Sequence, residues 1–363
     1  MNQDKLSNFI GGASISVVDA MAKIDLNARG ILFIEDESGI LQGCISDGDI
    51  RRWILKAGDL GVPVSDVMNI APKYLFAEER RRAWSLMERE AITALPILDR
   101  RRHIIDIELL SEGDKNQNKK SKKNLSMVPV VVMAGGEGTR LYPYTKILPK
   151  PLIPIGDIPI VERILDCYVE YGITKFYMTV NYKKGMIKSY FTDMAPSYHI
   201  EYVEEPKPLG TSGSIRLIED KFNSPFFVTN CDALIKADYG DIYDYHIASE
   251  NAITMVSALK NITIPYGIIH SGGNGEIQSM DEKPKLSYFI NTGMYVINPE
   301  IIELIPDDIM FHMTHLVDAA MKRGNKVGMY PISEDSFLDM GELSGMKRME
   351  EKLNIVSEER WKI

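Results

Sequence analysis

The strongest constraint on the fold is a regular alternation of strand-like and helix-like segments between residues 128 and 229. One helix-like segment, 159–171, has proline in its first turn and is followed by Gly172. Strands that alternate with helices pair into a largely parallel sheet with helices on both faces. Such sheets bind ligands beyond the carboxyl ends of their strands. We therefore predict an α/β, Rossmann-like domain with a mixed, mostly parallel sheet. Strands are expected at 128–133, 175–181, 200–204 and 226–229, and helices at 159–171, 184–192 and 211–220.

A low-complexity stretch, 111–124, precedes this alternation. It has no large apolar residue and is rich in lysine towards its end, which is typical of a solvated linker. A nucleic-acid patch is the alternative interpretation of the lysine run. We predict an N-terminal domain at 1–112, a flexible linker at 113–126 and a C-terminal domain at 127–363.

The N-terminal domain contains a weak internal repeat. A helix-like segment followed by two strand-like segments occurs twice, and two copies of this unit are the simplest description. We predict an α+β domain built from the pair. The segments are 16–21, 30–35 and 39–45 in the first copy, and 81–90, 94–98 and 103–107 in the second.

The chain is acidic, with 42 basic and 51 acidic residues and a net charge of -9. This charge disfavours non-specific binding to nucleic acid or to an anionic membrane. No apolar run is long enough to span a bilayer, and the N-terminus lacks the pattern of a signal peptide. Cys44, Cys167 and Cys231 match no metal-ligand spacing. We expect a cytoplasmic protein with reduced thiols and without nucleic-acid or membrane partners.

A glycine-rich turn, 134–141, follows the first predicted strand of the sheet and has the sequence Ala-Gly-Gly-Glu-Gly-Thr-Arg-Leu. Glycines let backbone N–H groups approach a phosphate closely. Arg140 adds a guanidinium whose geometry suits phosphate oxygens. Lys150 follows between two prolines, where a stiff backbone can direct its ammonium group at the same phosphates. The spacing matches neither a P-loop nor a dinucleotide fingerprint, and such a turn by itself is more typical of plain structure than of a ligand site.

The combination of Gly-Gly-x-Gly-Thr-Arg-Leu with Pro-Lys-Pro resembles the signature of the sugar-1-phosphate nucleotidyltransferases, and the resemblance extends from about residue 127 to about residue 349. It implies a GT-A-like fold. It also implies transfer of a nucleotidyl group from a nucleoside triphosphate to a sugar 1-phosphate, with release of pyrophosphate. The nucleotide-binding residues that it implies are Ala134, Gly135, Gly136, Gly138, Thr139, Arg140, Lys150, Glu205, Gly210 and Thr211.

This reaction brings two anions together, so the site must supply cations and alignment rather than a general base. The resemblance implies that Arg140, Lys150 and Lys283 neutralise phosphates. It also implies that Asp232, a catalytic residue, and Asp339 bind Mg²⁺, for which a shell of oxygen ligands is suitable. Taken alone, an aspartate after a strand is usually a turn former or a helix cap.

The acceptor sugar phosphate is expected to contact a second set of residues. Glu282-Lys283-Pro284 resembles the family's sugar-phosphate motif, although by itself it is an ordinary turn. The sequence departs from the family at Cys231, Phe337 and Thr292, where glycine, tryptophan and alanine are common. The implied contacts are Tyr266, Gly267, Glu282, Lys283, Asn291 and Thr292.

Glu205 bears on the choice of base. It lies in the segment 204–211, Glu-Glu-Pro-Lys-Pro-Leu-Gly-Thr, which resembles the base-binding segment of guanylyltransferases. A carboxylate can accept both adjacent donors of guanine, whereas thymine and uracil have one ring donor, so GTP is favoured. A solvated loop carboxylate is the alternative. Thymidylyl-, uridylyl- and cytidylyltransferases would share the same catalytic residues.

The N-terminal repeat resembles a pair of cystathionine-β-synthase-type (CBS) domains. Ser46 and Asp49 match the residues that hold the ribose of an adenine nucleotide in such domains, and the second copy lacks this motif. The pair therefore implies either one regulatory adenosine site or a purely structural module, and a homo-oligomer. A CBS pair fused to this kind of transferase resembles enzymes that supply GDP-linked amino sugars for nonulosonic acid synthesis. This resemblance implies glucosamine-1-phosphate as the acceptor, with mannose-1-phosphate or glucose-1-phosphate as alternatives. A nucleotide-sensing regulatory protein without catalysis is the alternative of another class.

Overall fold

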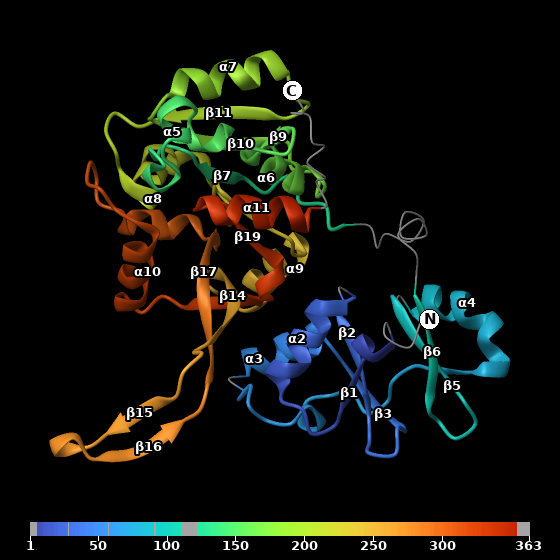
Figure 1. The fold of residues 1–363 in the computed structure, drawn as a ribbon. Helices are drawn as coiled ribbons and strands as arrows, with labels where there is room; N and C mark the ends of the chain where they lie inside the picture. The colour runs from blue at the N-terminus through green and yellow to red at the C-terminus, as the bar shows by residue number, and fades with distance from the viewer. Residues whose placement is uncertain (1–5, 28, 57, 91, 110–121, 354–363) are drawn as a thin grey trace, which may run out of the picture. The chain divides into compact units, whose positions relative to one another are not determined.

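Figure 1 shows the computed structural model, which describes residues 6–27, 29–56, 58–90, 92–109 and 122–353. The chain divides into two compact units, 1–121 and 122–363. Residues 113–121 of the expected linker lie outside the described residues. Its last residues are part of the second unit, because the Leu125 side chain is 2% exposed and the Leu125 N–H donates to the Tyr171 carbonyl at 2.8 Å. The expected linker is therefore too long at its C-terminal end.

The N-terminal unit contains two three-stranded sheets with the same topology. In each, the first strand pairs parallel with the second, which pairs antiparallel with the third. Helices connect the first two strands, so the predicted helix–strand–strand repeat is confirmed, with an additional strand before each copy. The strands are β1 (Ile10–Gly12), β2 (Ile31–Glu35), β3 (Leu41–Ser46), β4 (Leu75–Phe76), β5 (Ala94–Leu98) and β6 (Ile104–Leu109); the helices are η1 (Ser7–Phe9), α2 (Val17–Asn27), α3 (Asp47–Leu55), η2 (Val64–Asp66), η3 (Ala77–Arg82) and α4 (Ala83–Glu90).

The two sheets of this unit share one apolar core. Phe33 and Leu41 of the first sheet pack in the same cluster as Leu98 and Ile107 of the second. The Leu41 N–H also donates to the Arg102 carbonyl at 3.1 Å. The two copies of the repeat therefore form a single module.

A seven-stranded mixed sheet forms the centre of the second unit, in the order β11-β10-β7-β12-β17-β14-β18. The first four strands are parallel to one another, β17 is antiparallel to both neighbours, and β18 is parallel to β14. The prediction of a mixed, mostly parallel sheet is confirmed. The strands are β7 (Val130–Met133), β10 (Lys175–Val180), β11 (His199–Glu204), β12 (Phe226–Asn230), β14 (Ile253–Thr263), β17 (Lys285–Ile297) and β18 (Val327–Ile332).

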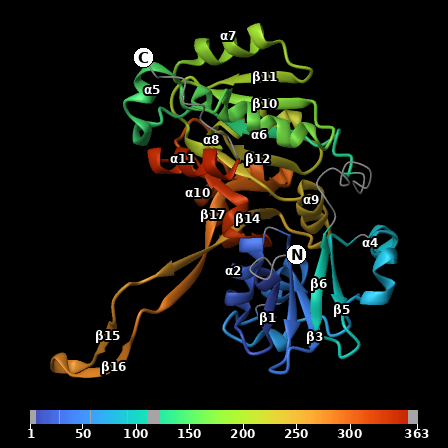
Figure 2. The same cartoon turned by 45° about the vertical axis from the view of Figure 1, so that its right-hand side comes forward.

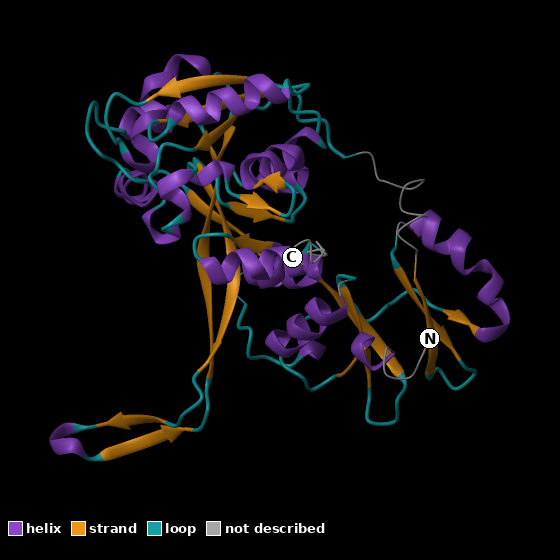
Figure 3. Cartoon of the chain, turned by 45° about the horizontal axis from the view of Figure 1, so that its top comes forward, coloured by secondary structure: helices purple, strands orange, loops and turns teal. Residues whose placement is uncertain are grey.

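Helices cover both faces of this sheet (Figures 2 and 3). Successive side chains of β7 alternate between the faces: Val130 and Val132 belong to one apolar core, and Val131 and Met133 to the other. This is why β7 is apolar throughout. The first core includes residues of α6 (Ile160–Val169), α7 (Lys184–Met194) and α9 (Tyr239–Ala248), and the second includes residues of η7 (Ser214–Lys221), η9 (Pro299–Leu304) and α10 (Met313–Lys322).

Three short strand pairs complete the unit: β13 (Ala233–Ile235) with β19 (Phe337–Asp339), β8 (Pro154–Ile155) with β9 (Ile158–Pro159), and β15 (Ile268–Ser271) with β16 (Ile277–Asp281). The last pair is a hairpin between β14 and β17. Further helices are η5 (Thr139–Leu141), α5 (Tyr144–Ile147), η6 (Lys150–Leu152), α8 (Gly210–Gly213), η8 (Gly273–Gly275), η10 (Glu334–Ser336) and α11 (Leu343–Lys352). None of the helices in the described part of the chain has the length and hydropathy needed to cross a lipid bilayer.

Candidate active site

Asp232 and Asp339 are brought together just beyond the carboxyl end of β12. Asp232 immediately precedes β13, whose first residue, Ala233, pairs with Asp339 at the end of β19. The Met340 N–H donates to the Asp232 carbonyl at 2.9 Å. The two aspartates predicted to bind metal thus meet at the strand ends where ligands of such sheets bind.

Charged groups of both signs surround these aspartates. Nζ of Lys150 forms an ion pair with Oδ2 of Asp232, and the two side chains are only 15% and 7% exposed. Burial raises the pKa of Asp339, and the negative charge of Asp232 raises it further. The Gly341 N–H, 2.9 Å from Oδ1 of Asp339, and the charges of Lys150 and Arg140 lower that pKa, but the net shift is upward. An additional cation would therefore stabilise the ionised pair of aspartates.

The glycine-rich turn packs against the segment that carries Lys150. Gly138 has a φ of +68°, and a Cβ there would lie 3.0 Å from Cβ of Lys150 and 3.0 Å from Cγ2 of Thr145. The Thr145 hydroxyl donates to the Gly138 carbonyl at 2.9 Å. Only glycine combines this backbone conformation with such a close approach. A Cβ on Gly136 would meet nothing within 4 Å, so this part of the turn is open to a ligand.

Glu205 lies against the same turn. A Cβ on Gly135 would come within 2.5 Å of Oε1 of Glu205, and the Leu209 N–H donates to Oε2 at 3.3 Å. The residue is 7% exposed, and burial raises the pKa of its carboxyl group. These contacts hold the turn against the segment after β11. Contact of Glu205 with the base stays a prediction.

A cavity of about 400 Å³ opens at this end of the sheet. It brings together six residues that the sequence analysis singled out, and several that it missed. Asn230 ends β12, so its place at a strand end could have identified it, whereas His312 and Thr314 at the start of α10 carry no motif. The predicted lining residues are Arg140, Thr211, Asp232, Asn291, Thr292 and Asp339; the missed ones include Asn230, Tyr295, His312, Met313 and Thr314.

Some of the predicted side chains also shape the wall of the cavity. The Thr211 hydroxyl accepts the Met313 N–H at 2.9 Å, at the start of α10. The Thr292 hydroxyl donates to the Val256 carbonyl at 2.7 Å, and Thr292 is 2% exposed. Thr292, a position where this chain departs from the pattern that the resemblance implies, thus carries a buried and satisfied hydroxyl.

A second cavity, of about 250 Å³, adjoins the first. The two cavities share Arg140, Phe337 and Asp339. The second also has basic residues from α11, Arg348 and Lys352, in its lining. Charged groups therefore face two neighbouring spaces, with the Arg140 guanidinium common to both.

Four residues expected at the acceptor sugar phosphate are not part of either cavity lining. Tyr266, Gly267, Glu282 and Lys283 lie beside the β15–β16 hairpin, which projects away from the rest of the unit in Figure 1. The Glu282 and Lys283 side chains are 68% and 65% exposed. Within one chain, the expected sugar-phosphate set is therefore divided between the cavity and the hairpin.

Ser46 and Asp49 of the N-terminal unit form a capping box at the start of α3. The Ser46 hydroxyl donates to Oδ2 of Asp49 at 2.6 Å and accepts the Asp49 N–H at 3.3 Å. Oδ1 of Asp49 forms an ion pair with Arg52. Both side chains are thus used to begin the helix, and adenosine binding there stays a prediction.

The three cysteines are free. Burial raises the pKa of the Cys44 and Cys167 thiols to about 11 and that of Cys231 to about 12. A thiol with such a pKa is protonated at neutral pH and is a poor nucleophile. Cys231, although next to Asp232, therefore has a packing role.

Comparison with known proteins decides the family. The family model described as "Nucleotidyl transferase" matches residues 129–354, which contain the whole site. The chain belongs to this family. Members most similar in sequence include the mannose-1-phosphate guanyltransferases of Saccharomyces cerevisiae and Candida albicans, each 34% identical over 184 residues, which is 48% of this chain and 51% of the relative. The chain thus spans about half the length of these curated relatives. The resemblance inferred from the motifs is confirmed for the family.

A solved structure agrees with this assignment. The crystal structure of HddC from Yersinia pseudotuberculosis is similar with a TM-score of 0.50 and 25% sequence identity. The match covers 62% of this chain and 100% of that one. The N-terminal unit lies outside the family match, and its resemblance to CBS domains stays a prediction.

Proposed function

We propose that this chain transfers a nucleotidyl group from a nucleoside triphosphate to a sugar 1-phosphate and releases pyrophosphate. The observation that carries the proposal is the convergence of Arg140, Lys150, Asp232 and Asp339 at the ends of β7 and β12, where an open glycine-rich turn meets two adjoining cavities. The larger cavity, of about 400 Å³, is within the size range of small-molecule sites.

The reaction is an in-line substitution at the α-phosphorus. An oxygen of the sugar phosphate forms a bond to this phosphorus, and the bond to the bridging oxygen of the β-phosphate breaks, so that pyrophosphate leaves with that oxygen. The attacking phosphate is already an anion and needs no base. Arg140 and the backbone of the glycine-rich turn would hold the triphosphate, and Lys150 would offset the charge that accumulates near Asp232. Alignment of two bound substrates supplies much of the rate.

The donor set of the site fits Mg²⁺. Asp232 and Asp339 offer carboxylate oxygens from adjacent strand ends, and the part of the chain that the structure describes adds no larger cluster of metal-ligating side chains. One or two carboxylates with phosphate oxygens and water are a usual magnesium shell. When bound, the ion would neutralise phosphate charge. Calorimetry should therefore show Mg²⁺ binding that is lost in the Asp339→Asn variant, independently of any turnover.

GTP is the proposed donor. The names of the relatives support a guanylyltransferase, and the hydrogen-bonding argument for Glu205 points the same way. For the acceptor, the relatives favour mannose-1-phosphate, whereas the resemblance of the N-terminal unit favours glucosamine-1-phosphate. Both sugar phosphates should therefore be tested as acceptors in the first assay.

Pyrophosphate release tests this proposal directly. GTP, dTTP, UTP, CTP and ATP are each combined with mannose-1-phosphate, glucosamine-1-phosphate, glucose-1-phosphate and N-acetylglucosamine-1-phosphate in the presence of Mg²⁺. We expect the fastest release with GTP and one of the first two sugars. A folded protein that releases no pyrophosphate with any pair contradicts the proposal.

A further inference from the structure

A projecting arm of the second unit lacks a partner within its own chain. We define the arm as residues 262–288, which comprise β15, β16, the segments that join them to β14 and β17, the last two residues of β14 and the first four of β17. Figures 1 and 2 show it from two directions, projecting from the far end of these long strands. Strand β17 begins at Lys285 and continues without a break to Asn291, which lies in the cavity wall. That stretch is about 20 Å long at roughly 3.3 Å per residue, so the start of β17 lies well away from the cavity.

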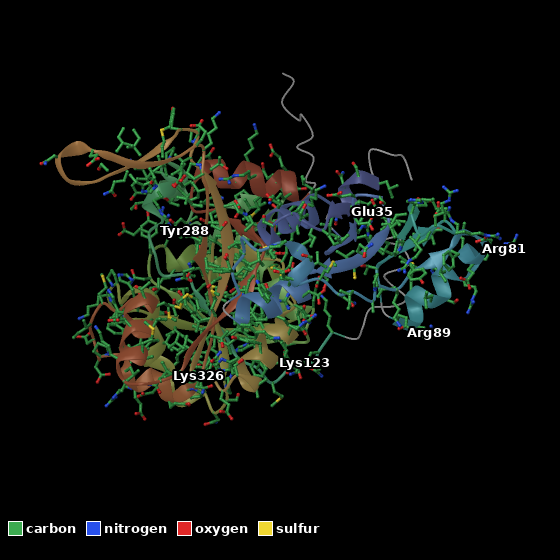
Figure 4. The ribbon with its side chains drawn as sticks, turned by 90° about the horizontal axis from the view of Figure 1, so that it is seen from below. Glu35, Arg81, Arg89, Lys123, Tyr288 and Lys326 are labelled. Atoms are coloured by element: carbon green, nitrogen blue, oxygen red, sulfur yellow. The ribbon has the colours of Figure 1, made fainter. Side chains whose placement is uncertain are left out.

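The arm exposes large apolar side chains on and beside its two strands. Tyr266, Ile269, Ile277 and Met280 are between 57% and 74% exposed. Tyr288, labelled in Figure 4, lies in β17 at the end of the arm and is 54% exposed. A two-stranded hairpin is marginally stable alone in water, and exposed apolar strands are usually covered by another surface. The composition of the arm is therefore that of a docking element.

Two segments next to cavity residues have a matching apolar surface. Tyr144 and Ile147, shortly after Arg140 in the sequence, are 51% and 71% exposed. Ile309 and Met310, shortly before His312, are 57% and 53% exposed. Arg140 and His312 both line the cavity, so exposed apolar side chains lie in the chain segments that border it.

The arm also carries an exposed cation, and the larger cavity has little positive charge of its own. Among the described lining residues of the larger cavity, Arg140 is the one lysine or arginine, and it faces Asp232 and Asp339. Two anionic substrates need more positive charge than this. On the arm, Lys283 is 65% exposed and is 3.9 Å from Glu282. A cation that the cavity needs is thus present on the element that projects from it.

We infer that the arm of one copy of this chain docks on the cavity of a second copy, where Lys283 and Glu282 complete the acceptor site. Reciprocal exchange of two arms gives a closed, two-fold symmetric dimer. The apolar residues of the arm cover the apolar segments beside the cavity. The docking itself does not depend on the reaction, but the role of Lys283 at the sugar phosphate rests on the proposed function.

A disulfide test detects the docking without any substrate. The variant Lys283→Cys/Thr314→Cys places one thiol on the arm and one on the exposed start of α10 in the cavity lining. After mild oxidation, we expect a covalent dimer on a non-reducing gel. The two single variants, which keep the three native cysteines, are the controls. A disulfide within a monomer would show that the arm folds back on its own cavity, and no disulfide would show that it docks on neither; both results overturn the inference.

Mixing two inactive variants then tests the shared site. Lys283→Ala removes the arm cation and Asp232→Asn disables the cavity, so each alone should be nearly inactive. When the two variants are co-expressed, random pairing should restore about a quarter of the wild-type rate. About half of the dimers are then mixed, and one of the two sites in each mixed dimer has both parts intact. If the wild type is active but the co-expressed variants do not recover activity, the site is not shared between two copies and the inference is overturned. An inactive wild type instead contradicts the proposed function, and the disulfide test still decides the docking.

Discussion

The ammonium group of Lys150 forms an ion pair with the carboxylate of Asp232, which lines the larger cavity, and both side chains are largely buried. Lys150 begins η6 between two prolines, and Asp232 follows β12. Asp339 adds a second carboxylate close by, and its raised pKa reflects burial and the charge of Asp232. The pair therefore links the nucleotide-binding segment to the proposed metal-binding residues.

Replacement of Lys150 should destabilise the fold, because it leaves a buried carboxylate without a partner. We expect Lys150→Met to lower the free energy of unfolding by about 3 kcal/mol in denaturant titrations without metal. Mg²⁺ should recover more stability in the variant than in the wild type, because the ion then neutralises both aspartates. Lys175→Met is the matched control, since Lys175 lies on the surface 3.8 Å from Glu201, and its loss should cost less than about 1 kcal/mol. Equal losses in the two variants would contradict the role of the pair.

Glu205→Gln should make the stability of the fold less dependent on pH. The raised pKa of Glu205 means that the folded state holds this proton more tightly than the unfolded chain. The protonated carboxyl group stabilises the folded state fully below the ordinary pKa of a glutamate, about 4.3. This contribution is lost as the pH rises through the raised pKa of Glu205. Glutamine keeps an acceptor for the Leu209 N–H and carries no charge. We expect the wild type to lose stability over this window in melting curves, and the variant to lose less; parallel profiles would contradict this account.

The same variant separates two roles of Glu205 in catalysis. If the carboxylate only holds the glycine-rich turn, kcat/KM should fall by a similar factor for GTP and UTP. If it also accepts the two donors of guanine, the preference for GTP should decrease by roughly tenfold or more, as expected for the loss of a charged hydrogen bond. The measured ratio of the two kcat/KM values distinguishes these outcomes.

The central part of the sheet could be predicted from the sequence because its elements are long and periodic. Strands 175–180 and 226–230 and helix 160–169 lie where apolar pattern and helix-end signals placed them. The pairing of β13 with β19 could not be predicted, because three residues are too few to show a period. That short pairing is what brings the two aspartates together.

The candidate site was predicted through motifs more than through pattern. Arg140, Asp232 and Asp339 meet as the resemblance implied. The location of Lys283 could not be predicted, because it depends on where a long hairpin projects, which local sequence does not determine. The internal hydrogen bonds of Thr292 were also missed, since its partner, Val256, is distant in the sequence.

Gly293 should tolerate no side chain. Its φ is +82°, and a Cβ there would lie 2.4 Å from Nδ2 of Asn230, which lines the cavity. Gly293→Ala should lower stability by about 2 kcal/mol or more, through backbone strain and overpacking, and should reduce turnover by displacing Asn230. Gly324→Ala is the matched control, because Gly324 has the same φ of +82° with nothing within 4 Å of its Cβ position. It should show only the strain, and an equal loss of turnover there would refute the explanation.

Ser46→Ala should cost about 1 kcal/mol of stability in the N-terminal unit, because it removes the cap of α3. Pyrophosphate release should be unaffected under saturating substrates. Calorimetry with AMP, ADP and ATP on the wild type tests the predicted adenosine site at the same place. Absence of binding would leave the capping role as the only function of Ser46.

The central claim is that the cavity beside Asp232 transfers a nucleotidyl group. The most direct measurement follows GTP labelled at the α-phosphorus, incubated with Mg²⁺ and mannose-1-phosphate or glucosamine-1-phosphate. With the wild type, the label should appear in a GDP-sugar together with an equal amount of pyrophosphate. With Asp232→Asn, checked for an unchanged circular dichroism spectrum, product formation should fall by roughly 100-fold or more. Label that remains in GTP with the wild type, or transfer that persists in the variant, would contradict the claim.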